Sequence, residues 1–224
     1  MGLEGTKKNI AIFSVITISA ISIFLISKKL FLNNSLKLKR IASKDINRWK
    51  GKVETDPLVS SELVDYWKNV GLTFTESDMQ KAGTHSNYPW SAVYVSHLIN
   101  KAGYKNFDYS RTHSSYTVNA KKDRDKKLEK SFWAYKPSEK QSVETGDILI
   151  KNRGGNNYNL DNINSGLISH GDVVVDIEII GGKKYAYLQG GNISDTIKKY
   201  KILLTDDNKL INNTTYFAQL KYKK

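Results

Sequence analysis

The spacing of apolar residues in this chain changes from a helical period to a period of two near Gly146. Before that point, residues 60–71 and 91–102 carry apolar side chains at the spacing of a helix face. After it come short runs such as "GDILIK", "GDVVVDIEII" and "KKYAYLQ", the last two joined by a Gly-Gly turn that is typical of a hairpin. Helices followed by an antiparallel sheet predict one α+β domain, which we place at residues 58–224.

The N-terminal region contains a single uncharged stretch at residues 10–27, close to the length that a helix needs to cross a bilayer. We expect an uncleaved transmembrane anchor there, after a basic N-terminus at residues 1–9 and before a polar juxtamembrane connector at residues 28–57. A cleavable signal peptide is the alternative, because Lys7 and Lys8 form a basic start. The apolar residues continue past the expected cleavage region, which favours the anchor.

The chain is strongly basic, with a formal net charge of +13. This charge suits an anionic neighbour such as a cell-wall polymer, acidic lipid or nucleic acid, and a Lys- and Asn-rich genome bias would produce it equally well. No basic strand interleaved with aromatic residues supports base stacking, so nucleic acid is not an expected partner. The chain has no cysteine, which excludes disulfides, thiolate metal sites and a cysteine nucleophile.

Ser91 stands at the start of the second predicted helix, within the tetrad Pro-Trp-Ser-Ala. Three interpretations are open: a serine nucleophile, a residue of a binding domain without catalysis, and a helix N-cap. His170 opens an apolar strand in "SHGDVVV", where a rigid backbone could hold an imidazole against a neighbouring helix end. A lone histidine at a strand edge is more often structural, so its meaning depends on the residues around it.

His113 and Tyr116 are three residues apart and would share one face of a helical turn. Facing a cleft, they would bind substrate or supply a second acid–base group; otherwise they form a hydrogen-bonded pair that supports the helix of Ser91. The four histidines show no metal-ligand spacing, and the two Gly-Gly segments lack the lysine of a phosphate-binding loop. We expect neither a metal nor another cofactor.

Taken in order, these motifs resemble the cysteine/histidine-dependent amidohydrolase and peptidase (CHAP) domains and the papain-like cell-wall hydrolases. They resemble more closely an uncharacterised bacterial family, a domain of unknown function related to these enzymes, whose members carry Pro-Trp-Ser-Ala. The resemblance spans about residues 85–200 and implies a papain-like fold. Its positions are Pro89-Trp90-Ser91-Ala92, His113, Tyr116, Gly146-Asp147, Arg153, His170, Asp172 and Gly190-Gly191-Asn192.

The resemblance implies a hydrolase of amide bonds in peptidoglycan peptides, with serine in the usual cysteine position. A hydroxyl is too weak an acid for a helix end to ionise, so Ser91 would need His170 as a general base. Asn192 or Asp172 would orient the imidazole, and N–H groups at the helix start would stabilise the oxyanion. Substrate contacts are expected from Trp90, His113, Tyr116 and Arg153.

The implied location is the bacterial inner or cytoplasmic membrane, with a single span at residues 10–27 and the domain on the outer side. More basic residues follow this span than precede it, which by itself favours the opposite orientation, and the conflict stays open. The implied partner is peptidoglycan or another anionic envelope polymer. The rival hypothesis is an inactive papain-like module that binds envelope glycan or peptide through Tyr88, Trp90, Phe132, Trp133 and Tyr135.

Overall fold

The computed structural model describes residues 29, 32–211 and 215–223. Residues 32–48 are helical. The elements after them are η1 (Pro57–Val59), α2 (Ser60–Lys68), α3 (Glu76–Met79), α4 (Ala82–Asn87), α5 (Ser91–Ala102), α6 (His113–Asp125), β1 (Phe132–Tyr135), η2 (Pro137–Glu139), β2 (Ile148–Asn152), β3 (Ser169–Ile180), β4 (Lys183–Gly190), β5 (Lys198–Leu203) and β6 (Tyr216–Tyr222).

The six strands form one antiparallel sheet in the order β1-β6-β2-β3-β4-β5. Strands β3 and β4 are joined at Gly181-Gly182, both with positive φ, as the hairpin pattern predicts. The predicted helix at residues 91–102 is confirmed as α5, which packs on β3 near the middle of the sheet. The chain therefore has an α+β fold in which one helix start lies close to a central strand.

Both faces of the central strands are buried, which explains their continuous apolar runs. Ile148 and Ile150 of β2 belong to the main core, which lies between the sheet and helices α2, α5 and α6. Leu149 points to the opposite face, as strand geometry requires, and joins a second, smaller core. That second core is closed by Val143 and Leu204, which lie outside the six strands.

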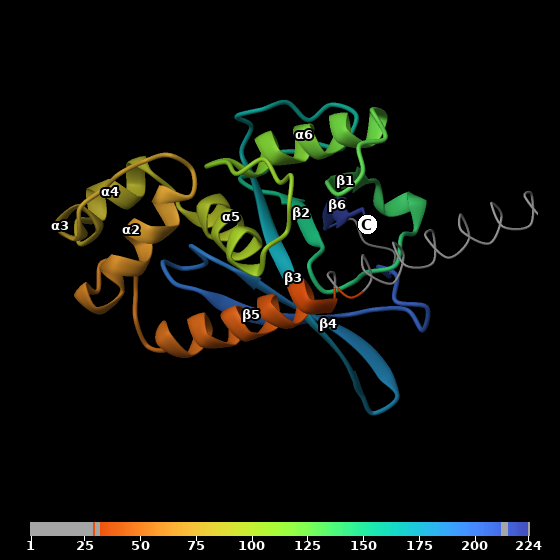
Figure 1. Ribbon diagram of the computed structural model, residues 1–224, viewed down its shortest axis with the longest axis horizontal. Helices are drawn as coiled ribbons and strands as arrows, with labels where there is room; N and C mark the ends of the chain where they lie inside the picture. The colour runs from red at the N-terminus through yellow and green to blue at the C-terminus, as the bar shows by residue number, and fades with distance from the viewer. Residues whose placement is uncertain (1–28, 30–31, 212–214, 224) are drawn as a thin grey trace, which may run out of the picture.

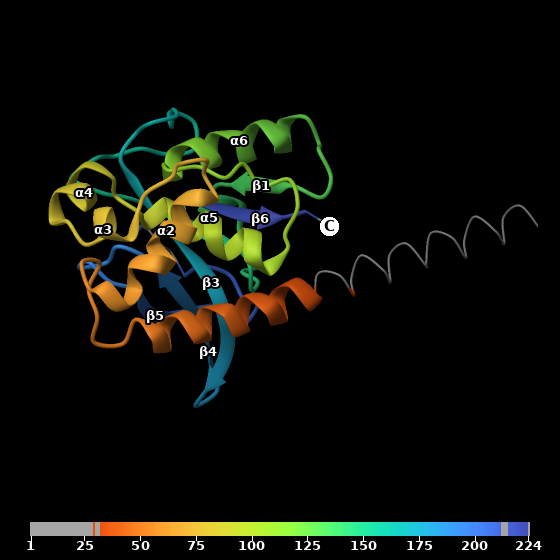
Figure 2. The ribbon, with the colours of Figure 1, turned by 60° about the vertical axis from the view of Figure 1, so that its left-hand side comes forward.

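The segment at residues 28–57, which we expected to be a connector, contributes to the main core. Leu38, Ala42 and Trp49 are each at most 1% exposed. Gln189 of β4 donates a hydrogen bond of 2.9 Å to the carbonyl oxygen of Ala42, and Figure 2 shows the helix lying across β4. The basic residues of this helix are on its exposed side. The segment therefore appears polar in sequence although one face of the helix is buried.

The transmembrane helix that we expected before the domain requires a correction. Among residues 29, 32–211 and 215–223, no helix is long and apolar enough to cross a bilayer, and the predicted anchor at residues 10–27 lies outside this range. The longest described helix, at residues 32–48, buries one face against the domain and carries exposed lysine and arginine side chains on the rest of its surface. The fold class is corrected to an α+β domain without a membrane-spanning helix in its described part, and the single-pass membrane location that depended on that helix is withdrawn.

Truncating Leu38 tests whether the helix at residues 32–48 is part of the folded core. Leu38→Ala should lower the free energy of unfolding by about 2–5 kcal/mol, the usual cost of truncating a fully buried leucine. Leu36 lies on the same helix but is 65% exposed. Leu36→Ala should therefore change the free energy of unfolding by less than about 0.5 kcal/mol. Equal effects in denaturant unfolding of the two variants would show that this helix does not pack on the domain.

Candidate active site

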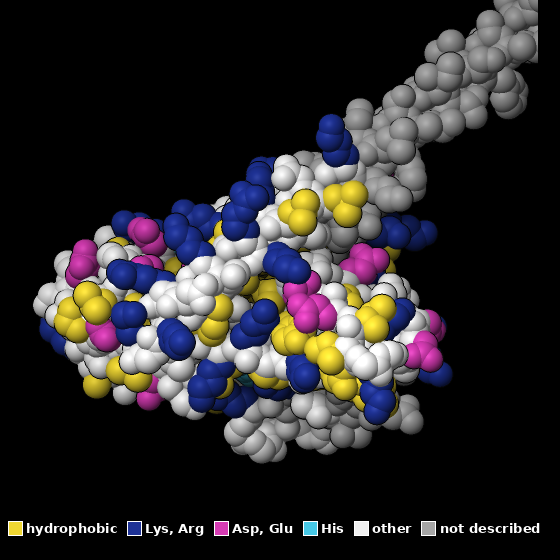
Figure 3. All heavy atoms as spheres, turned by 90° about the horizontal axis from the view of Figure 1, so that it is seen from below, with side chains coloured by type: hydrophobic (Ala, Val, Ile, Leu, Met, Phe, Trp, Pro, Cys, Tyr) yellow, Lys and Arg dark blue, Asp and Glu magenta, His cyan; other side chains and the backbone are white. Residues whose placement is uncertain are grey.

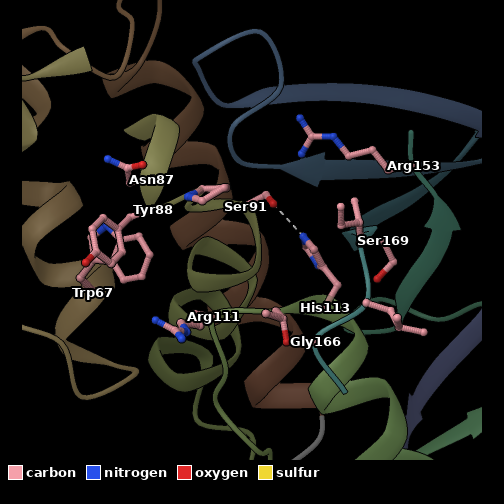
Figure 4. Close-up of a pocket in the computed structure, with 13 residues that line it drawn as sticks. Trp67, Asn87, Tyr88, Ser91, Arg111, His113, Arg153, Gly166 and Ser169 are labelled. Carbon is pink, nitrogen blue, oxygen red and sulfur yellow. Dashed lines mark hydrogen bonds between the residues drawn. The ribbon is translucent and has the colours of Figure 1, made fainter. Parts of the chain in front are cut away.

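A cleft of about 330 Å³ lies at the N-terminal end of α5. Ser91 is the first residue of α5 and His113 is the first residue of α6, and both line the cleft. Ser91 Oγ lies 2.8 Å from His113 Nε2, and each residue is only 4% exposed. Figure 4 shows the two side chains pointing toward each other, so a hydroxyl and an imidazole meet at the edge of a cavity.

The interpretation of Ser91 as an N-cap is wrong. The cap position of α5 is held by Trp90, and no side-chain hydrogen bond caps this helix. The Ser91 hydroxyl bonds to the imidazole of His113 instead. The first N–H groups of an α-helix have no intrahelical partner, so the start of α5 retains donors beside the hydroxyl.

His113 is held from its other side by Tyr116, one helical turn further along α6. The phenol oxygen of Tyr116 forms a short hydrogen bond with Nδ1 of His113. Either tautomer of the ring satisfies both of its hydrogen bonds, since each partner is a hydroxyl that can donate or accept. The two residues are therefore a hydrogen-bonded pair, and the same pair faces the candidate nucleophile.

Gly171 makes room for this pair on β3. A Cβ at Gly171 would lie 2.8 Å from His113 Nδ1 and 2.8 Å from the Tyr116 hydroxyl. Such distances are well inside van der Waals contact, so a side chain here would displace the ring. The glycine of "SHGD" is the position that lets α6 bring an imidazole to the start of α5.

The environment of His113 keeps its imidazole neutral. Burial lowers the pKa of His113 well below the ordinary histidine value, and the charge of His170 lowers it further. The negative charge of Asp172 acts in the opposite direction but is the smaller effect. A neutral ring is the form that can accept a proton from Ser91.

His170 lies beside His113 rather than against Ser91. The ring centroids of the two histidines are 5.2 Å apart. In the described part of the chain, no hydrogen bond joins His170 to Ser91; its Nε2 lies 2.9 Å from Asp172 Oδ1. The structure therefore gives the Ser91 hydroxyl a different histidine from the one that the sequence predicts.

Asp172 is a fully buried carboxylate with three polar partners. Besides His170, it accepts a 2.5 Å hydrogen bond from the Tyr200 hydroxyl and lies 3.2 Å from Lys151 Nζ. Burial alone would raise the pKa of Asp172, but the hydrogen bond and charge of His170, the charge of Lys151 and the hydrogen bond of Tyr200 together lower it below its usual value. A carboxylate this deeply buried is stable only with such partners.

The remaining predicted site residues separate into two groups. Arg153 lines the cleft. Trp90 is fully buried in an aromatic cluster with Trp49 and Tyr94 and does not line the cleft. Asn192 follows the end of β4 with a φ of 55°, and its side chain has no hydrogen bond to a histidine among the described residues. The hydrogen bond of the His170 ring is made with the carboxylate of Asp172.

Sequence reasoning missed Arg111, Lys151 and Tyr200. Arg111 lines the cleft and lies two residues before His113, so its position next to a candidate residue was an available signal. Lys151 is the cross-strand partner of His170 in the β2–β3 pairing. That register, and the approach of Tyr200 from β5, depend on how the strands pair and cannot be derived from the spacing of motifs.

The donor sets of the fold do not indicate a metal centre. Within the described ranges, no group of three or more histidine, aspartate and glutamate side chains is placed to hold a metal ion. The side chains that line the cleft include a hydroxyl, an imidazole and two guanidinium groups.

The titration of His113 tests this electrostatic description. In an NMR titration of ring-labelled protein, His113 should remain neutral well below pH 6.5, the pKa of an ordinary histidine. The unfolded chain takes up a proton near that pH and the folded chain does not, so the stability that His113 contributes is present above about pH 6.5 and is lost as the pH falls. His113→Gln should flatten this acid loss of stability. A His113 midpoint near pH 6.5 in the folded protein would contradict the description.

Comparison with known proteins places the chain in a bacterial family. A family model described as "Uncharacterized protein conserved in bacteria (DUF2272)" matches residues 60–223, from the start of α2 through β6. No curated protein and no solved structure matches the chain. The expectation of a bacterial domain of unknown function is confirmed. The match covers most of the chain, which therefore belongs to the DUF2272 family of uncharacterised bacterial proteins.

Proposed function

We propose that the protein is a papain-like serine hydrolase that cleaves amide bonds, with Ser91 as nucleophile and His113 as general base. The observation that supports this is the 2.8 Å hydrogen bond between Ser91 Oγ and His113 Nε2 at the edge of a cleft. A nucleophile, a neighbouring base and a third group that orients the base form the arrangement that activates a hydroxyl. Here Tyr116 is the third group.

The proposed relation to the CHAP and papain-like hydrolases is supported by the order of the motifs and by the position of Ser91. The candidate nucleophile begins a helix that packs on a central strand of an antiparallel sheet. That position places developing negative charge near the positive end of the helix dipole.

In the proposed reaction, the Ser91 oxygen attacks the substrate carbonyl carbon while His113 Nε2 takes the hydroxyl proton. The Nδ1–H of the resulting imidazolium donates to the Tyr116 oxygen, and N–H groups at the start of α5 stabilise the oxyanion. His113 then gives the proton to the amine as the C–N bond breaks, which leaves an acyl group on Ser91. Water, deprotonated by His113, then attacks the acyl carbonyl carbon. The C–O bond to Ser91 breaks, His113 returns the proton to the serine oxygen, and the acid is released.

His170 and Asp172 act in this proposal as positioning groups behind the base. The negative charge of Asp172 favours the cationic form of His113, which exists only during turnover, whereas positive charge on His170 opposes it. His170 lies 2.9 Å from the Asp172 carboxylate and so weakens the effect of that negative charge on His113. This assignment replaces the role of base that the sequence suggested for His170.

Peptidoglycan peptides remain the proposed substrate class on the basis of the family resemblance. A cleft of about 330 Å³ is at the small end of ligand sites, which suits a short peptide segment. The rival hypothesis, an inactive binding module, relies on the five aromatic residues named above. Of these five, only Tyr88 lines the cleft. Trp90 and Phe132 are buried, and Trp133 and Tyr135 lie on β1. The five side chains do not line one cleft, so the hydrolase is the better-supported proposal.

A serine-directed fluorophosphonate probe tests the proposed nucleophile. The wild-type protein should be labelled at Ser91, and Ser91→Ala should abolish labelling. His113→Gln should slow it by about 10²–10⁴-fold, the usual contribution of a general base. The matched control is Ser96→Ala, because Ser96 is buried on the same helix and bonds to the backbone of Ser110 instead of a histidine.

The control variant should be labelled at the wild-type rate, with circular dichroism showing that every variant is folded. An unlabelled wild-type protein, or labelling that survives Ser91→Ala, would contradict the proposal. Peptide binding without any labelling would favour the inactive module.

A further inference from the structure

Two arginines and no acidic residue line the cleft. Arg111 lies just before α6 and Arg153 just after β2. Both are exposed, and neither guanidinium has a hydrogen bond or ion pair with another described residue. By contrast, Arg48 and Arg124 are paired with carboxylates of the fold. The two arginines of the cleft are therefore available to a ligand.

The two guanidinium groups flank the candidate nucleophile. In Figure 4, Arg153 extends on one side of the Ser91–His113 pair, and Arg111 lies on the other side, toward the wall formed by Trp67 and Tyr88. A substrate whose carbonyl carbon lies at the Ser91 hydroxyl would extend toward both arginines. The charge of the cleft is thus placed on both sides of the reacting bond.

We propose that the substrate is a short peptide carrying a carboxylate on each side of the scissile amide, one bound by Arg111 and the other by Arg153. The planar guanidinium fork matches the geometry of a carboxylate and binds it through two parallel hydrogen bonds. The exposed ring of Tyr88, which packs against Trp67, contacts the aliphatic part of the peptide. This inference rests on the proposed function, since it takes Ser91 as the reacting centre.

A basic protein attracts anions in general, and this attraction differs from specific binding of carboxylates by Arg111 and Arg153. The chain has a net charge of +13, and Figure 3 shows Lys and Arg side chains scattered over the molecular face rather than gathered in one patch. Arg40 offers a matched control, because it is exposed on the helix at residues 32–48 and does not line the cleft. Its replacement removes the same charge without altering the cleft.

The experiment measures peptide binding to the Ser91→Ala protein by calorimetry at physiological salt. The probes are acetyl-Glu-Ala-Ala with a free C-terminus and its neutral analogue, acetyl-Gln-Ala-Ala-amide. The acidic peptide should bind about tenfold more tightly or better, as charge-assisted pairing predicts. Arg111→Gln and Arg153→Gln should each reduce this preference by about threefold or more, and Arg40→Gln should leave it unchanged.

Two peptides with a single carboxylate, acetyl-Glu-Ala-Ala-amide and acetyl-Gln-Ala-Ala with a free C-terminus, assign the contacts. Each should lose affinity with one arginine replacement and be insensitive to the other. Equal affinities for the acidic and neutral peptides, no binding of either at millimolar concentration, or an equal loss with Arg40→Gln would overturn the inference.

The outcome is distinguishable from failure of the proposed function. Fluorophosphonate labelling of Ser91 without an acidic preference would retain the hydrolase and reject the two-carboxylate substrate. An acidic preference that depends on Arg111 and Arg153, in a protein that is never labelled, would retain the binding specificity and reject the hydrolase.

Discussion

The hydrogen bond between Ser91 and His113 depends on three elements meeting at one point. Ser91 begins α5, His113 begins α6, and β3 has a glycine, Gly171, where the imidazole packs. Each contact alone is common, but together they leave a neutral histidine beside a hydroxyl at the edge of a cleft. Because a serine cannot be ionised by a helix end, this close imidazole is what makes a nucleophilic role physically reasonable.

The two histidines of the site have different surroundings, although their rings are only 5.2 Å apart. His113 faces the cleft between two hydroxyls, whereas His170 binds the buried carboxylate of Asp172. The first arrangement is suited to moving a proton, and the second holds a charge in the interior. Gly190 of β4 makes room for Asp172 as Gly171 makes room for His113. A Cβ at Gly190 would lie 1.9 Å from the Asp172 carboxylate.

Individual helices and strands were easier to predict from the sequence than the contacts between distant segments. Apolar spacing located α5 correctly, because a helix packed on a sheet needs a continuous buried face. It did not reveal the burial of Leu38 behind a basic surface, nor that His113 would reach Ser91, because both depend on how distant segments pack. The Asp147 motif residue is structural: it is buried and accepts a hydrogen bond from Gln219. Motif order thus selected residues that lie close together in the fold, but it did not predict that Ser91 bonds to His113.

His113, rather than His170, is the hydrogen-bond partner of residue 91. The most direct test of this pairing is the rate at which iodoacetamide alkylates a Ser91→Cys protein that also carries His113→Gln or His170→Gln. A thiolate next to an imidazole is favoured by that imidazole, so His113→Gln should slow alkylation at neutral pH by about tenfold or more, and His170→Gln by much less. A larger loss with His170→Gln, in variants shown to be folded, would contradict the account.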